Sequence, residues 1–151
     1  MANQNAEQKA RDRIDELLRQ SGWVVQDYAN INLTAGRGIA VREFRMRHGH
    51  GKADYLLYVD RQAVGVIEAK PEGHTLTGVE LQGEKYSNGL PLEIPQVLTP
   101  LPFLYLSTGV ETRFTNTLDP DPTSRDVFTF HRPETLAAYL QPPPGNESRC
   151  C

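Results

Sequence analysis

The chain of 151 residues lacks the features that would place it in a membrane or outside a cell. Its only two cysteines, Cys150 and Cys151, are adjacent at the C-terminus, where neighbouring thiols make poor disulfide partners and poor metal ligands. No segment approaches the roughly 20 apolar residues that a membrane-spanning helix needs. Residues 1–10 lack the apolar centre of an export signal. We therefore expect a cytoplasmic protein with no membrane contact.

An excess of positive charge is also missing, because the formal net charge is −3. Nucleic-acid-binding domains are usually basic, so this balance counts against such a partner. A single local run is basic, however, and phosphate contacts need only a local patch. The run could form a phosphate-binding surface or could be a solvated strand and loop. It consists of Arg42, Arg45, Arg47, His48, His50 and Lys52.

Hydrophobic periodicity predicts alternating helices and strands. Apolar residues at helical spacing, including Ala10, Ile14 and Leu18, indicate a helix over residues 5–20. We expect further helices over 77–88 and 133–140. After an extended segment from residue 23, we expect strands over 39–45, 53–59, 63–70, 103–108, 111–116 and 127–130. The predicted fold is α/β, a mixed central β-sheet flanked by helices, in one domain over 1–140 with a flexible tail or linker over 141–151.

Two charged residues close the apolar strand predicted over 63–70. Side chains alternate along a strand, so Glu68 and Lys70 share a face with Val64 and Val66. Glu68 and Lys70 are separated by about 6.6 Å along the strand. Charges at the buried end of a sheet are costly unless they are paired or bound to a metal.

The preceding strand places a second carboxylate beside Glu68. If Asp60, Arg61 and Gln62 form the hairpin loop, Val59 lies opposite Ala63 and Asp54 lies opposite Glu68 on the same face. A two-residue loop would turn Asp54 to the other face unless a bulge intervened. Opposed carboxylates repel each other unless a cation lies between them. The alternative is a hairpin with a surface ion pair.

Phosphodiester hydrolysis uses residues of these types. Carboxylate oxygens hold Mg²⁺ while leaving water positions open, and the metal lowers the pKa of a bound water. A neighbouring lysine such as Lys70 can orient the nucleophile or stabilise the transition state. In the helix predicted next, Gln82 and Tyr86 are four residues apart and share a face, which could bring an amide and a phenol to the site. An ordinary amphipathic helix explains that pair equally simply.

An Asp followed after thirteen residues by Glu-x-Lys resembles the PD-(D/E)xK nuclease superfamily. A narrower resemblance is to the N-terminal nuclease domain of the restriction, or motor, subunit of type I restriction enzymes. It is carried by Gly-Lys-Ala-Asp-Tyr (51–55), Val-Ile-Glu-Ala-Lys-Pro-Glu (66–72) and the Gln-x-x-x-Tyr pair. Segments 17–23, 102–109, 111–115 and 127–136 extend it, so that it covers about residues 7–140.

The resemblance implies a restriction-endonuclease-like fold and a set of site residues. By that resemblance Asp54 and Glu68 bind Mg²⁺, Lys70 is the catalytic lysine, and Gln82 and Tyr86 are the accessory pair. An acid on an upstream helix often completes such sites. Glu7 is the candidate for this third metal ligand and Glu16 the alternative, although Glu7 is also spaced to pair with Arg11 on the same helix.

The resemblance also implies partners: double-stranded DNA, an ATP-driven motor domain, and methylation and specificity subunits. The 151 residues contain no Gly-x-x-x-x-Gly-Lys-[Ser/Thr] phosphate loop, so ATP would act only through a motor domain outside them. The sequence thus favours a Mg²⁺-dependent endonuclease domain of a type I restriction–modification complex. Two alternatives stay open: a non-catalytic module of nuclease fold that docks or holds DNA, and a repair or junction-resolving nuclease.

Overall fold

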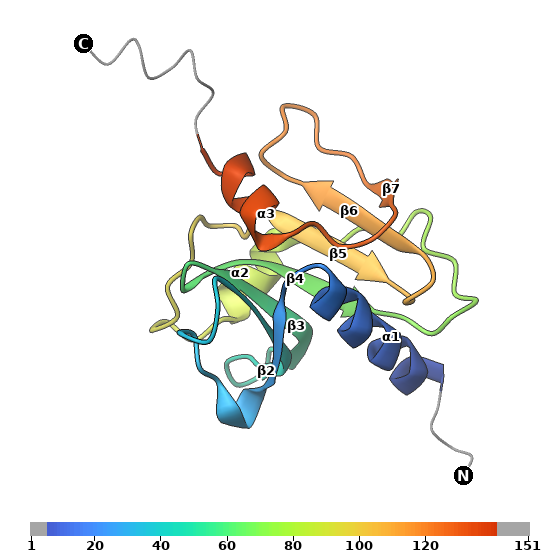
Figure 1. The fold of residues 1–151 in the computed structure, drawn as a ribbon. Coiled ribbons are helices and arrows are strands. Elements are labelled where there is room, and N and C mark those ends of the chain that lie inside the picture. Colours follow the sequence, from blue (N-terminus) through green and yellow to red (C-terminus); the bar gives the residue numbers. More distant parts are fainter. Residues whose placement is uncertain (1–5, 142–151) are drawn as a thin grey trace.

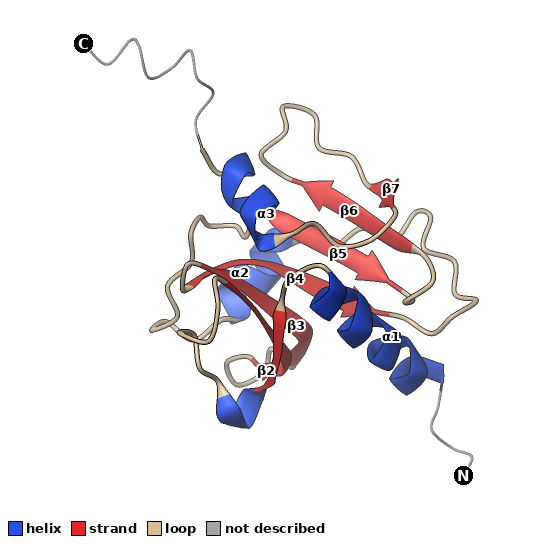
Figure 2. Cartoon of the chain, viewed as in Figure 1, coloured by secondary structure: helices blue, strands red, loops and turns tan. Residues whose placement is uncertain are grey.

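The computed structural model of the protein describes residues 6–141 (Figures 1 and 2). All but the first residue of the predicted tail, including both cysteines, lie outside this range. The described elements are α1 (Ala6–Gln20), β1 (Val24–Asp27), the 3-10 helix η1 (Tyr28–Asn30), β2 (Gly38–Arg45), β3 (Lys52–Val59), β4 (Gln62–Ala69), α2 (Gly83–Gly89), β5 (Phe103–Ser107), β6 (Thr112–Asn116), β7 (Arg125–Val127) and α3 (Pro133–Tyr139).

The strands form one mixed sheet in the order β1-β2-β3-β4-β5-β6-β7. β1 pairs with β2 and β4 pairs with β5 in parallel, and the other neighbours are antiparallel. The predicted class, a mixed central sheet flanked by helices in a restriction-endonuclease-like fold, is confirmed. No helix in residues 6–141 is long and apolar enough to cross a bilayer.

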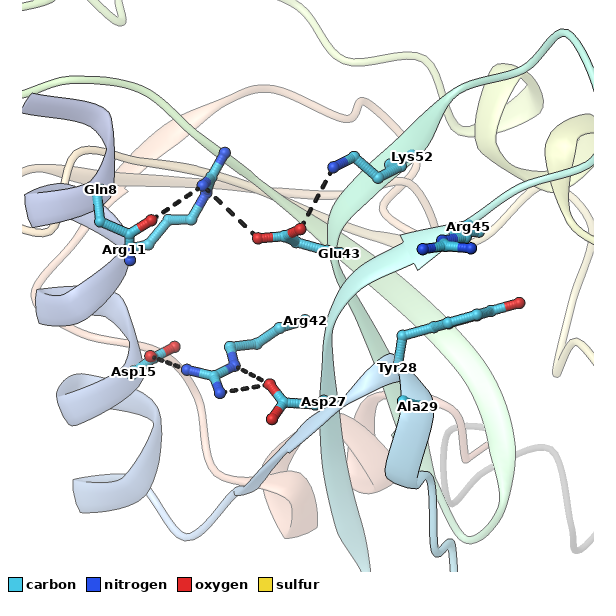
Figure 3. A pocket seen from close by; sticks show the side chains of 10 residues that line it. All are labelled: Gln8, Arg11, Asp15, Asp27, Tyr28, Ala29, Arg42, Glu43, Arg45 and Lys52. Atoms are coloured by element: carbon cyan, nitrogen blue, oxygen red, sulfur yellow. Dashed lines mark hydrogen bonds and ion pairs between the residues drawn. The ribbon is translucent and has the colours of Figure 1, made fainter. Parts of the chain in front are cut away.

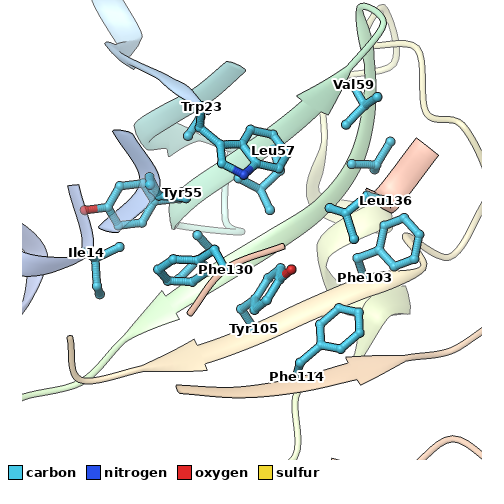
Figure 4. Packing of buried hydrophobic residues seen from close by; sticks show 14 of the residues in the cluster. Ile14, Trp23, Tyr55, Leu57, Val59, Phe103, Tyr105, Phe114, Phe130 and Leu136 are labelled. Atoms are coloured by element: carbon cyan, nitrogen blue, oxygen red, sulfur yellow. The ribbon is translucent and has the colours of Figure 1, made fainter. Parts of the chain in front are cut away.

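Helices α1 and α3 cover one face of the sheet (Figure 1). Ile14 and Leu18 of α1 and Leu136 of α3 pack with buried residues of the strands, including Tyr105 (Figure 4). The polar groups of Trp23 and Tyr105 in this core have hydrogen-bond partners. The Trp23 indole Nε1 donates a hydrogen bond to the His131 carbonyl at 2.8 Å, and the Tyr105 hydroxyl lies 2.6 Å from His131 Nδ1.

Helix α2 covers the opposite face. Tyr86 and Leu90 pack there against Leu56 and Val66 of the central strands and against Leu101 of the following loop. The helix has seven residues, fewer than the twelve predicted. Gly78, with a φ of +83°, lies in a turn within the predicted range, and residues 79–82 are irregular. Glycine weakens a helix because its backbone loses the most freedom on ordering.

The β3–β4 hairpin reaches the predicted arrangement by a different route. Val59 pairs with Gln62 rather than with Ala63, so the turn has two residues, Asp60 and Arg61. Both have positive φ, as a type I′ turn requires, and such a turn matches the twist of the two strands. The predicted three-residue loop was therefore wrong.

A bulge corrects the register further along the hairpin. Tyr58 pairs with Ala63 but Leu57 pairs with Gly65, which leaves Val64 as the extra residue of β4. Tyr55 then pairs with Ile67, and continuing this register by one residue sets Asp54 opposite Glu68. The bulge therefore compensates for the two-residue turn and keeps the Asp54 and Glu68 carboxylates on one face of the hairpin.

The last strand is shorter and earlier than predicted. β7 ends at Val127, and Phe128 points fully into solvent. Phe130 leaves the sheet and packs edge-on against Tyr105 at a ring-centroid distance of 5.0 Å. Tertiary packing of this aromatic ring outweighs the strand propensity of residues 128–130.

Candidate active site

Asp54 and Glu68 lie side by side where β3 and β4 leave the buried core. The Asp54 side chain is 18% exposed. Its Oδ2 accepts a hydrogen bond of 2.8 Å from the backbone N–H of Ala69, the residue that follows Glu68. This bond ties the Asp54 carboxylate to the end of β4, so the backbone holds the two acidic groups close together.

Burial and proximity disfavour the ionised forms of both carboxyl groups. Burial raises the pKa of Asp54, although the Ala69 N–H and the charge of Arg11 act in the opposite direction. Burial also raises the pKa of Glu68, and the negative charge of Asp54 raises it further. Two half-buried carboxylates that repel each other are stabilised by a cation placed between them.

Lys70 follows directly after β4. Its backbone N–H donates to the Ser107 carbonyl at 2.9 Å, which continues the β4–β5 pairing past Ala69. The positive charge of its ammonium group favours the ionised forms of Asp54 and Glu68 and so partly opposes the increase in their pKa values. Within residues 6–141 Lys70 makes no direct ion pair. The predicted trio therefore converges, and the ammonium keeps its hydrogen-bonding capacity for another group.

Tyr86 of α2 bonds a residue of the site, and Gln82 forms no such bond within the described residues. The buried Tyr86 hydroxyl donates to Glu68 Oε1 at 2.9 Å, and burial together with the charge of Glu68 raises the tyrosine pKa. Gln82 is the residue before α2, and its exposed side chain forms no hydrogen bond with the described part of the chain. Tyr86 thus orients Glu68, and a role of Gln82 at the site stays a prediction.

Of the two candidate acids on α1, Glu7 lies near the site. Its Oε1 is 3.9 Å from a terminal nitrogen of Arg11, and the same nitrogen is 3.6 Å from Asp54 Oδ1. The charge of Glu7 raises the pKa of Asp54. Glu16 is exposed and accepts a hydrogen bond from Gln20, which lies about one turn further along the helix.

The donor set of the site suits a hard cation. Asp54 and Glu68 offer only oxygen atoms, and Mg²⁺ is commonly held by one or two carboxylates while it keeps several waters. Among residues 6–141 no group of three or more His, Cys, Asp or Glu side chains is arranged to bind a metal. The site therefore fits Mg²⁺ through two carboxylates.

A charged cavity of about 380 Å³ next to the site was not predicted from the sequence (Figure 3). It lies between α1, η1 and the β2–β3 pair. On its wall Arg42 donates to Asp15 Oδ2 at 2.7 Å and also bonds Asp27, while the Tyr55 hydroxyl donates to Asp15 Oδ1 at 2.6 Å. The sequence feature that could have indicated this buried network is the position of Asp15, which directly follows the buried Ile14 in α1.

The basic run divides between structural and exposed residues. Arg42 belongs to the network just described. The Arg45 guanidinium lies 5.6 Å from the centroid of the Tyr28 ring, and Arg47 bonds the Asn88 carbonyl at the end of α2. His48 and His50 are exposed in the β2–β3 turn. Only part of the run is thus free to meet a partner.

Residues 26–100 match the family described as the type I restriction enzyme EcoKI endonuclease subunit, second domain. The comparisons with curated proteins and with solved structures gave no match. The matched segment contains β2, β3, β4 and α2, and with them Asp54, Glu68, Lys70 and Tyr86. The match identifies residues 26–100 as similar to the endonuclease subunit of type I restriction enzymes and supports a nuclease region of such a subunit.

Proposed function

We propose that the domain is a Mg²⁺-dependent endonuclease that cleaves double-stranded DNA within a cytoplasmic type I restriction–modification complex. The observation that carries the proposal is the convergence of Asp54, Glu68 and Lys70 at the end of one hairpin. The family match of the same hairpin supports a role in restriction. The partners would be the motor domain, through which ATP acts, and the methylation and specificity subunits.

Each residue has a distinct role in this proposal. Asp54 and Glu68 would hold Mg²⁺, which when bound supplies an acidic water and neutralises charge on the phosphate. The Ala69 N–H holds Asp54 in place, and the Tyr86 hydroxyl holds Glu68. Lys70 would donate to a phosphate oxygen or to the attacking water. Glu7 would act on Asp54 through Arg11, as a positioning residue.

Lys70→Ala tests the proposal in the assembled complex. We expect the variant to nick plasmid DNA about 100-fold more slowly at saturating Mg²⁺, because a preorganised donor to the reacting phosphate is lost. The control is Lys9→Ala, which removes an exposed ammonium on α1 and should leave the rate unchanged. Unchanged nicking by Lys70→Ala would favour a non-catalytic module, and strong ATP-independent preference for branched DNA would favour a junction-resolving nuclease.

Stabilisation of the domain by Mg²⁺ should increase with pH. The folded-state pKa values of Asp54 and Glu68 are raised, so without metal the folded chain binds more protons than the unfolded chain. The contribution of these groups to stability is therefore present at low pH and is lost as pH rises through the folded pKa values. Mg²⁺ binds the ionised forms and reverses this loss.

The measurement is the midpoint of thermal unfolding with and without Mg²⁺ between about pH 5 and pH 8. We expect the Mg²⁺-induced increase to be largest at the upper end of this range. Glu68→Gln should abolish the pH-dependent part of the increase. An increase that is equal at every pH, or that survives in Glu68→Gln, would count against metal binding by this pair.

A further inference from the structure

Arg11 of α1 reaches into the acidic site and lies between three carboxylates. Its terminal nitrogens are 3.6 Å from Asp54 Oδ1, 3.8 Å from Glu43 Oε2 and 3.9 Å from Glu7 Oε1. These residues come from three elements, α1, β2 and β3. The side chain is 22% exposed, so the guanidinium is accessible from the cavity of Figure 3.

The guanidinium is held by charge and hardly by hydrogen bonds. It carries five N–H donors, but its only hydrogen bond within the described chain is a long one of 3.4 Å to Gln8 Oε1. Its Nε is buried and has no partner there. All three carboxylates are farther away than a charge-assisted hydrogen bond, which is about 2.7–2.9 Å long. An unsatisfied donor beside a half-buried acid indicates that an acceptor is missing.

Arg42 in the same cavity shows how a purely structural arginine is held in this fold. It donates to Asp15 at 2.7 Å through one terminal nitrogen and to Asp27 at 3.0 Å through Nε. Arg42 therefore forms direct bonds to two acids, whereas Arg11 forms none to its three. Figure 3 shows both side chains on the cavity wall, with Arg42 between its two partners.

The backbone that carries Arg11 is nevertheless fixed. The Tyr55 hydroxyl bonds the Arg11 carbonyl at 3.0 Å as well as Asp15. One residue earlier the loop after β5 presses against α1, since a Cβ on Gly109 would lie 3.1 Å from the Ala10 carbonyl oxygen. The contacts thus hold the backbone at Arg11, so that the guanidinium can change partner only by a change of side-chain conformation.

We propose that Arg11 exchanges with the divalent cation at Asp54 and then binds the phosphate group of the DNA. In the metal-free protein its guanidinium is the counter-ion of Asp54. When a divalent cation takes Asp54 Oδ1, the two positive charges repel and the guanidinium turns to a phosphate oxygen beside the metal. This inference rests on the proposed function. It assigns substrate binding to a residue of α1, which lies outside the β3–β4 hairpin and its Glu-x-Lys motif.

The test measures Mg²⁺ and DNA binding separately with the full chain. The variants are Arg11→Gln and Arg19→Gln, the second removing an exposed arginine from the far end of α1. We expect Arg11→Gln to bind Mg²⁺ alone about tenfold more tightly by calorimetry, because a competing charge is gone. In a Lys70→Ala background, in which cutting is expected to be about 100-fold slower, it should bind a labelled DNA duplex about tenfold more weakly at saturating Mg²⁺. Arg19→Gln should change neither value.

If Arg11 had only a structural role, its replacement would weaken the binding of both Mg²⁺ and the DNA duplex. Tighter Mg²⁺ binding together with weaker duplex binding would therefore exclude that explanation. Unchanged or weaker Mg²⁺ binding by Arg11→Gln would overturn the exchange, and unchanged duplex binding would overturn the phosphate contact. If Arg11→Gln is poorly folded, Arg11→Lys keeps the charge and should retain the parent's Mg²⁺ affinity while losing duplex affinity. Failure of the parent chain itself to bind Mg²⁺ would instead reject the proposed function.

Discussion

Asparagine in place of Asp54 is expected to abolish Mg²⁺ binding and to slow DNA cleavage by about 1,000-fold or more in the assembled complex. The substitution removes one negative charge and keeps the size of the side chain. The Asn Oδ1 can still accept the Ala69 N–H that Asp54 Oδ2 now accepts at 2.8 Å. The end of the hairpin should therefore keep its shape, and the loss should come from the missing metal ligand.

Asp60→Asn is the control for Asp54→Asn. This substitution also replaces an aspartate with asparagine, but in the exposed β3–β4 turn. There the Asp60 carboxylate lies 3.0 Å from the Arg37 guanidinium. Because exposed ion pairs contribute little, this variant should cleave DNA within about twofold of the parent. Mg²⁺ binding by calorimetry and plasmid cleavage are the two measurements. A folded Asp54→Asn chain with normal cleavage would show that the site lies elsewhere.

Gly65→Ala is expected to lower the free energy of unfolding by about 3 kcal/mol or more, the largest stability effect that we anticipate. Gly65 lies at the β4 bulge and pairs with Phe103 of β5. A Cβ built on Gly65 would lie 2.2 Å from the Phe103 carbonyl oxygen and 2.9 Å from the Phe103 Cβ. Since the nearest obstacle is backbone, no side-chain rotation removes the clash, and β4 and β5 must separate.

Gly49→Ala is the control that separates the effect of a steric clash from the effect of backbone strain. Gly49 has a φ of +87° in the exposed β2–β3 turn, and a Cβ there would meet nothing within 4 Å. It should cost only the strain of a left-handed alanine, about 1 kcal/mol. Urea unfolding of both variants gives the comparison. Equal losses would mean that β4 and β5 are not packed as closely as described, and Glu68 would lose its fixed place with them.

Local patterns were sufficient to predict the elements that bury a regular apolar face. The stripe through Ala10, Ile14 and Leu18 predicted α1. Alternation along β4 put Val66 and Glu68 on the face that α2 covers, but the bulge turns Val64, which was expected on the same face, into the cluster under α1 and α3. Tyr86 was also predicted to reach the site, and it does so through Glu68. These predictions succeeded because the spacing of side chains along one helix or strand depends only on backbone geometry.

Features that depend on several elements at once were predicted poorly. The two-residue turn and the bulge at Val64 replace the expected three-residue loop, and α2 begins only at Gly83, which leaves Gln82 exposed. Neither the bulge nor the helix start has a decisive local signal. Both depend on how the strands and the loop from Leu101 pack together, because burial outweighs local propensity.

The sequence by itself therefore determined the α/β class, the acidic pair and lysine of one hairpin, and the resemblance that the family match supports. Only the tertiary structure showed that Arg11 lies between Glu7, Glu43 and Asp54, and that Asp15 joins α1 to Arg42 and Tyr55. These charges are distant in sequence and have no common spacing. They meet because the packing of α1 against the sheet brings separate elements to one place, and electrostatic coupling depends on distance in space.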